Sequence, residues 1–255
     1  MSLQKIITYL NTKIKDDNIT IGEGYGNENF CYLIYSLIRM EHPQTVIELG
    51  SGLGSTTCMM AQALKENGKG TLWAIDNGQD WKTLKKHVGK PNQSYENFFK
   101  KLLERLELDE IVKFKNITLA PASFFNPQTP VDMMFFDAHD SSAQGCVQLL
   151  RYYLPIMNKY SSIFIDRSST INHAYLMLEQ LVQYLQRGKI PACLVANRPP
   201  EEVNAIHQLV LNSKFTLIHL AETEAGKKNK AQNSTSWIKI EPLDILIHNK
   251  VENLF

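Results

Sequence analysis

Short apolar runs alternate with longer amphipathic stretches along most of the chain from residue 45 onward. The short runs predict buried strands, and the stretches with apolar residues at helical spacing predict helices. The expected strands are 45–49, 71–76, 111–117, 131–138 and 161–166, and the expected helices are 55–64, 94–108, 144–157 and 170–187. Strands that alternate with helices pair in parallel through right-handed crossovers. We therefore expect an α/β fold, with a parallel sheet covered by helices on both faces.

Both ends of the chain depart from this alternation. At the N-terminus, helical spacing over 3–14 and 27–42 predicts two helices that precede the sheet. At the other end, two strand-like runs, 214–222 and 234–246, flank a polar, lysine-rich segment. These two runs predict an antiparallel hairpin that finishes the parallel sheet.

The composition is that of an ordinary globular protein. Of the 255 residues, 44% are hydrophobic and 21% are charged, and the formal net charge is +1. This balance gives no electrostatic footprint for nucleic acid or for an anionic membrane. No linker divides the sequence, so we expect one structural domain, with residues 1–44 as a helical cap on a ligand-binding domain over residues 45–255.

The cysteines and the lengths of the apolar runs indicate where in the cell the protein is expected. The four cysteines lie far apart in the sequence and fit neither a zinc site nor a disulfide framework. The N-terminal segment is too polar for a signal peptide, and no stretch approaches the ~18 apolar residues that a membrane span needs. We expect a soluble, cytoplasmic protein.

The most informative motif follows the first expected strand. There an apolar run passes into glycines at alternate positions, and a helix opens directly afterwards. Glycine lets a backbone approach a ligand closely, and a helix N-terminus offers unpaired N–H groups. A nicotinamide site would carry GxGxxG instead, with the third glycine placed for helix packing. The candidate binding residues are Glu48, Gly50, Ser51, Gly52, Gly54 and Ser55. The alternative is a plain strand-to-helix turn.

This GxGxG motif, with an acid two positions ahead of it, resembles the first motif of class I S-adenosylmethionine (SAM)-dependent methyltransferases. The resemblance implies a Rossmann-like fold with a C-terminal antiparallel pair, SAM as cofactor and S-adenosylhomocysteine (SAH) as product. SAM carries no phosphate, and its amino and sulfonium groups are cationic. The carboxylate of Glu48 therefore suits it, directly or through water.

A second acid, Asp76, ends the second expected strand. A carboxylate at this place can accept hydrogen bonds from both hydroxyls of a ribose, and neighbouring Asn77 could assist it. The alternative is a turn former, since Asp-Asn-Gly is a good turn sequence. In the family, the loop after the third strand borders the adenine. Ala122 and Ser123 stand at those positions, without an acid beside them.

The run FFDAHD, followed by a helix and then FIDR, resembles the small-molecule O-methyltransferases of the catechol, caffeoyl-CoA and sugar-tailoring types. In metal-dependent members, an Asp and an Asp-Asn pair bind Mg²⁺, which polarises the hydroxyls of the substrate. By position the two aspartates are Asp137 and Asp166, and Arg167 replaces the asparagine. Arginine cannot ligate a cation. We therefore expect no metal; should one bind, Asp137 and Asp166 are its candidate ligands.

The catalytic assignments leave alternatives open. Arg167 either supplies the charge that a metal would have given and orients an anionic substrate, or forms a structural salt bridge with one of the aspartates, or points elsewhere. A hydroxyl acceptor usually needs a general base, and His139 stands where the family's base often lies. The alternative is that His139 caps the next helix or faces solvent. His173 is a second choice.

These features predict a SAM-dependent methyltransferase (EC 2.1.1.-) that methylates a hydroxyl of a small molecule. The resemblance also allows a homodimer through the N-terminal helices. Three alternatives stay open: a non-catalytic SAM-binding protein, a nicotinamide-dependent oxidoreductase, and a methyltransferase of RNA or protein. The amino-group signature (N/D)PP(Y/F) does not occur after the fourth strand, and the near-zero net charge disfavours RNA.

Overall fold

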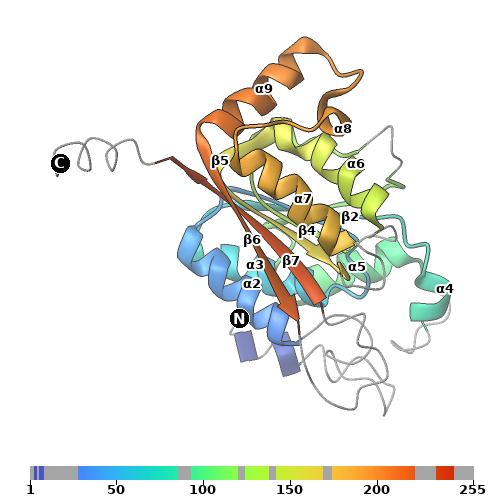
Figure 1. Cartoon of the computed structure of the whole chain (residues 1–255). Coiled ribbons are helices and arrows are strands. Elements are labelled where there is room, and N and C mark those ends of the chain that lie inside the picture. Colours follow the sequence, from blue (N-terminus) through green and yellow to red (C-terminus); the bar gives the residue numbers. More distant parts are fainter. Residues whose placement is uncertain are drawn as a thin grey trace, which may run out of the picture.

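A mixed sheet of seven strands forms the centre of the molecule in the computed structural model, which describes residues 3–4, 6–8, 28–85, 93–119, 124–137, 142–168, 174–221 and 234–243 (Figure 1). The strand order is β3-β2-β1-β4-β5-β7-β6. Strands β1 to β5 pair in parallel, and β7 runs antiparallel to both β5 and β6. The predicted parallel sheet with an antiparallel finish is confirmed. The strands are β1 (Thr45–Leu49), β2 (Thr71–Asp76), β3 (Val112–Asn116), β4 (Val131–Phe136), β5 (Met157–Asp166), β6 (Ser213–Ala221) and β7 (Ser234–Pro242).

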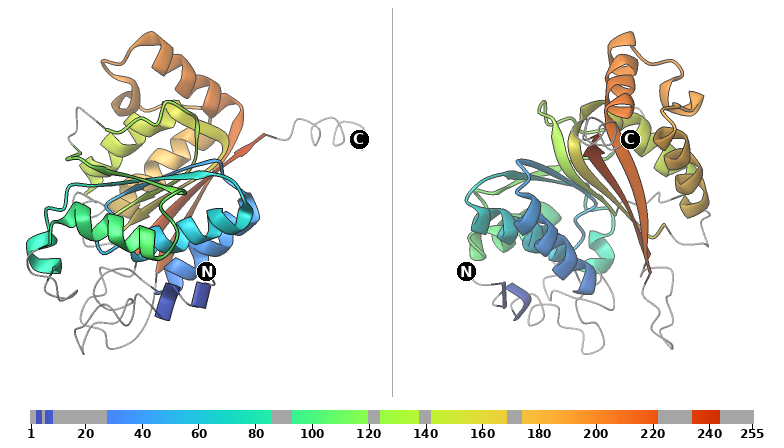
Figure 2. Two further views of the ribbon diagram at one scale, coloured as in Figure 1. Left: turned by 180° about the vertical axis from the view of Figure 1, so that it is seen from behind. Right: turned by 60° about the vertical axis from the view of Figure 1, so that its left-hand side comes forward.

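Helices cover the two faces of this sheet, as the right-hand view of Figure 2 shows most plainly. One hydrophobic cluster joins the sheet to α2, α3 and α5, and a second joins its other face to α6, α7 and α9. None of the described helices combines the length and the apolar character that a membrane crossing needs. The helices are α2 (Glu28–Glu41), α3 (Ser55–Asn67), α4 (Trp81–Leu84), α5 (Tyr95–Arg105), α6 (Ala143–Tyr153), α7 (Ala174–Gln186), α8 (Ala192–Val195) and α9 (Pro200–Leu211).

Strand β1 lies in the middle of the parallel part, between β2 and β4. All five of its residues are buried, because helices pack on both of its faces. Val46 contributes to the cluster beneath α2 and α3, and Ile47 and Leu49 contribute to the cluster beneath α6 and α7. The short, mostly apolar run over Thr45–Leu49 therefore predicted a buried strand correctly.

One expected helix ends earlier and one expected strand begins earlier than predicted, and two helices were not predicted. The helix expected over 144–157 ends at Tyr153, because Pro155 lies in a short 3₁₀ turn (Leu154–Ile156) and cannot donate to a continuing helix. Met157 instead begins β5, four residues before the strand expected at 161. Helices α8 and α9 were not predicted; α9 begins at Pro200, which favours the first helical position.

Candidate active site

The carboxyl ends of the parallel strands bring the predicted site residues to one edge of the sheet. Glu48 lies near the end of β1, Asp76 ends β2, Asp137 follows β4 and Asp166 ends β5. The chain leaves β1 for β2 on one side and reaches β4 on the other, so this edge contains the topological switch point at which open α/β sheets bind ligands.

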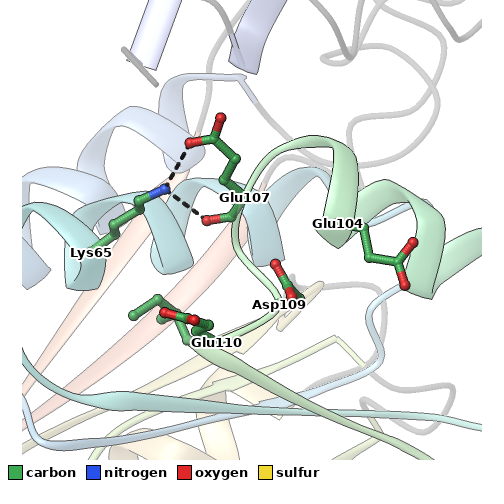
Figure 3. Close-up of a pocket in the computed structure, with 6 residues that line it drawn as sticks. Lys65, Glu104, Glu107, Asp109 and Glu110 are labelled. Carbon is green, nitrogen blue, oxygen red and sulfur yellow. Dashed lines mark hydrogen bonds and ion pairs between the residues drawn. The ribbon is translucent and has the colours of Figure 1, made fainter.

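A hollow elsewhere on the surface has no part in this arrangement (Figure 3). It is lined by Lys65, Glu104, Glu107, Asp109, Glu110 and Ile111. Lys65 lies near the end of α3 and Ile111 directly precedes β3, so the hollow is at the amino edge of the sheet. Lys65 Nζ donates to the backbone oxygen of Glu107 at 2.8 Å. None of the predicted site residues lines this hollow.

The glycine loop, residues 50–54, connects β1 to α3. Its glycines Gly50, Gly52 and Gly54 have φ angles of 90°, 50° and 85°. Residues other than glycine rarely adopt this region. A Cβ on Gly54 would lie 2.7 Å from Leu102 Cδ2, whereas a Cβ on Gly52 would meet no described atom within 4 Å. Gly54 is therefore needed for helix packing, and none of the described residues fills the side of Gly52 on which a ligand could lie.

Glu48 lies fully buried beneath this loop. Its Oε2 accepts hydrogen bonds from the hydroxyls of Ser51, at 2.9 Å, and Thr57. Its Oε1 is buried and has no hydrogen-bond partner among the described residues. Burial raises the pKa of Glu48 to about 8, although both hydroxyls favour the charged form. A buried carboxyl with one unused oxygen is suited to a cationic ligand group.

Asp76 ties the glycine loop to the end of β2. Its Oδ2 accepts hydrogen bonds from the backbone N–H groups of Ser51 at 2.8 Å and Gly52 at 3.0 Å. Its Oδ1 accepts one from Gly78 at 2.7 Å, which is the turn-forming contact that the Asp-Asn-Gly sequence predicts. A carboxylate has about four acceptor sites, so Asp76 keeps capacity for a ligand hydroxyl.

Two other predicted cofactor residues lie at this end of the sheet. Asn77 Nδ2 donates to Thr118 Oγ1 at 3.2 Å and so links the ends of β2 and β3. Ser55 begins α3, and its hydroxyl is buried without a hydrogen-bond partner among the described residues. No described side chain caps the N-terminus of α3, which leaves its first N–H groups for a ligand or solvent.

Asp137, Asp166 and Arg167 form an ion cluster at the ends of β4 and β5. One guanidinium nitrogen of Arg167 lies 3.1 Å from Asp137 Oδ1, and Arg167 Nε lies 3.6 Å from Asp166 Oδ2. Arg167 has a φ of 52°, a left-handed conformation that is uncommon for a residue other than glycine. Thr235 of β7 donates to Asp166 Oδ1 at 3.1 Å. The guanidinium thus bridges both carboxyl groups.

The two carboxyl groups are held in an unfavourable electrostatic setting. Burial raises the pKa of Asp166 to about 6, against the opposing effect of Arg167. Burial also raises the pKa of Asp137 well above its ordinary value; repulsion from Asp166 adds to the shift and the guanidinium opposes it. Within the described residues, no group of three or more His, Cys, Asp and Glu side chains could hold a metal ion.

Some predicted residues fall outside the described part of the chain: His139, His173, Ala122 and Ser123. In turn, the site includes residues that the sequence did not indicate: Thr57, Tyr95 and Thr235. Thr57 stands nine residues after Glu48, on the first turn of α3, so its contact could have been inferred from the helix geometry. The other two reach the site through packing between distant segments, for which the sequence has no local signal.

Part of the chain is similar to a family of known proteins. Residues 47–168 match the model of a methyltransferase-domain family. No curated protein sequence matches the chain. A methyltransferase from Geobacter sulfurreducens has a similar solved structure, with a TM-score of 0.52 at 13% identity, over 94% of this chain and 91% of its own.

Two more solved structures are similar over most of their length. A Klebsiella pneumoniae protein assigned as an O-methyltransferase gives a TM-score of 0.50 at 14% identity, over 94% of this chain and 89% of its own. An O-methyltransferase from Bacillus cereus, solved in complex with SAH, gives a TM-score of 0.49 at 12% identity, over 94% of this chain and 90% of its own. At these identities, the likeness to the Klebsiella pneumoniae and Geobacter sulfurreducens structures shows the fold alone, which is Rossmann-like α/β. The matched span, residues 47–168, holds the glycine loop, Asp76, Asp137 and Arg167.

Proposed function

We propose that this chain is a SAM-dependent methyltransferase that methylates a hydroxyl group of a small molecule. The observation that carries the proposal is the glycine loop. The backbone N–H of Gly52 is bound to Asp76, while no atom of the described residues lies within 4 Å of the place that a Cβ on Gly52 would fill. A rigid loop with an open face, next to two carboxyl groups, is suited to a ligand that carries positive charge and a ribose.

The residues present fit SAM. Glu48 offers its unused Oε1 to the amino group of the cofactor, directly or through water, and Asp76 accepts from the ribose hydroxyls. The GxGxG spacing of the loop, in place of the GxGxxG of a nicotinamide site, argues against a dinucleotide at the same place. When bound, SAM supplies a methyl group on its sulfonium. The chain's own task is to align the acceptor oxygen with that methyl.

Arg167 is assigned to orienting the acceptor. Its guanidinium bridges Asp137 and Asp166 at the carboxyl edge of the sheet, where it can pair with an anionic acceptor or with the oxyanion that forms on deprotonation. The same position holds a metal ligand in the metal-dependent relatives that the sequence resembles. Because a fixed cation at this place repels a divalent ion, we propose that methyl transfer requires no metal.

His139 is assigned as the general base, which takes the proton from the acceptor hydroxyl on a ring nitrogen. It follows Asp137 by two positions at the end of β4, and this place in the sequence is what supports the assignment.

The proposal is tested by measuring SAH release from SAM across a panel of phenols, sugar alcohols and hydroxy acids, in Mg²⁺ and in EDTA. We expect turnover with at least one acceptor class, the same rate in EDTA, and loss of turnover in Asp76→Ala. Turnover that stops in EDTA would contradict the role given to Arg167. Binding of SAH without turnover of any acceptor would favour a non-catalytic SAM-binding protein.

A further inference from the structure

The peptide groups on both sides of Gly52 are held from two different segments. Its N–H donates to Asp76 Oδ2 at 3.0 Å, and its carbonyl oxygen accepts from the hydroxyl of Tyr95 at 2.8 Å. Asp76 ends β2, whereas Tyr95 begins α5, which follows later in the chain. The residue with the open face toward a ligand is therefore fixed by a carboxylate on one side and by a phenol on the other.

Tyr95 also contacts the turn that follows Asp76. A Cβ added to Gly78 would lie 2.7 Å from Tyr95 Cδ1 and 2.8 Å from its Cβ, so the ring is directly against the backbone of that glycine. One tyrosine thus touches both cofactor-site segments, the glycine loop and the turn after β2. The hydroxyl contacts the glycine loop, and the ring contacts the turn.

The position of the Tyr95 ring is itself fixed by packing. The residue is 5% exposed, and its ring centroid lies 5.6 Å from that of Trp81 and 5.7 Å from those of Phe99 and Phe114. Ser94 caps α5 immediately before it. A phenol held in this way directs its hydroxyl without a further loss of side-chain entropy.

The helix that carries Tyr95 supports the rest of the loop by apolar contact. One and two turns further along α5, Phe99 and Leu102 lie against Gly54, where an added Cβ would be 3.3 Å and 2.7 Å from their side chains. These contacts fill space and have no directionality, so they do not orient a peptide group. Among the described residues, the phenol of Tyr95 is the hydrogen-bond donor that α5 provides to the loop.

We propose that Tyr95 is a positioning residue for the cofactor, which preorganises the glycine loop by holding the Gly52 carbonyl while its ring supports the turn at Gly78. This inference rests on the proposed function, because it assumes that the loop binds SAM. Tyr95 does not touch the cofactor in this account. It acts through the carbonyl of Gly52 and so complements Asp76, which holds the N–H of the same residue.

Removing the hydroxyl of Tyr95 should therefore weaken the binding of SAH. Tyr95→Phe keeps the ring and its packing and leaves the Gly52 carbonyl without its donor. The loop then has to be ordered by the ligand, so we expect the dissociation constant of SAH to rise about five- to tenfold, with a more unfavourable binding entropy. The pKa of Tyr95 is raised well above its ordinary value by burial, so the hydroxyl remains a donor at every pH used.

The test is calorimetric titration of SAH into wild type, Tyr95→Phe and Tyr35→Phe. Tyr35 is a matched control: its hydroxyl donates to Glu66 between α2 and α3, away from the loop. We expect the control to bind SAH as wild type does. The proposal is overturned if Tyr95→Phe binds SAH within twofold of wild type, or if Tyr35→Phe weakens binding equally. Absence of SAH binding to wild type would instead overturn the proposed function.

Hydrogen exchange by mass spectrometry separates positioning from a general loss of structure. Without SAH, Tyr95→Phe should exchange the amides of Ser51 and Gly52 faster than wild type, and saturating SAH should remove the difference. The amides of α5 should exchange at the wild-type rate in both states. Faster exchange throughout α5 would show that the hydroxyl is needed for the helix itself and would contradict the proposal.

Discussion

Glu48→Gln should change how the stability of the protein depends on pH. In the folded chain, burial raises the pKa of Glu48 to about 8 from an ordinary value of 4.5. Between these two pH values the folded state keeps the proton and the unfolded state releases it. The free energy of unfolding therefore falls as pH rises through this window. The stabilisation is fully present below pH 4.5 and is lost as the pH passes about 8.

The magnitude follows from the number of protons. One proton released on unfolding lowers the free energy of unfolding by about 1.4 kcal/mol per pH unit, or about 3 kcal/mol between pH 5.5 and 7.5. Glutamine cannot titrate, but it resembles the protonated acid: its carbonyl oxygen can accept from Ser51 and Thr57 as Oε2 does. Glu48→Gln should therefore lack this part of the pH dependence while keeping the local structure.

Urea unfolding followed by circular dichroism at pH 5.5, 6.5 and 7.5 measures the effect. We expect wild type to lose about 3 kcal/mol more stability than Glu48→Gln across this range, since every other titrating group is common to both proteins. Glu104→Gln, on the exposed side of α5, controls for the loss of a carboxylate as such and should follow wild type. Parallel profiles for wild type and Glu48→Gln would refute the reasoning about the buried acid.

Two further predictions concern the glycine loop and the ion cluster. Gly54→Ala should destabilise the fold by roughly 2–4 kcal/mol in urea unfolding, because its Cβ would collide with Leu102 Cδ2, whereas Gly52→Ala should cost only about 1 kcal/mol but abolish SAH binding. Equal losses of stability would contradict the different roles of the two glycines. Arg167→Asn replaces the guanidinium beside Asp137 with an oxygen donor, and Mg²⁺ should then raise the melting temperature of this variant but not of wild type. A wild type that Mg²⁺ stabilises would contradict the assignment of Arg167.

The sequence predicted the parts of the fold that local patterns control. Buried strands such as β1 are short, mostly apolar runs, and glycines at positive φ mark the loop that follows. The strand-end acids Asp76 and Asp137 could be placed at one edge because parallel strands end together. The hydrogen bond from the loop backbone to Asp76 could not be predicted, since it depends on the register of β2 against β1.

Other parts of the site depend on contacts between distant segments. Tyr95 has the apolar periodicity of a core residue of α5, and the sequence contains no sign that its hydroxyl reaches Gly52. Thr235 contacts Asp166 because β7 pairs antiparallel with β5 in one register, which the two sequences do not specify alone. A salt bridge between Arg167 and one of the two aspartates was one of several open alternatives. The structure places the guanidinium 3.1 Å from Asp137 and 3.6 Å from Asp166.

The most direct test of the central claim is calorimetric titration of SAM, SAH and NAD into wild type, Asp76→Ala and Asp132→Ala. Asp132 is a matched control, because its Oδ2 also accepts from two backbone N–H groups, those of Gln44 and Thr45, at the opposite edge of the sheet. The account predicts micromolar binding of SAM and SAH to wild type and Asp132→Ala, none to Asp76→Ala, and no binding of NAD. Wild type that binds neither sulfur compound, or that binds NAD instead, would contradict the assignment of SAM to this glycine loop.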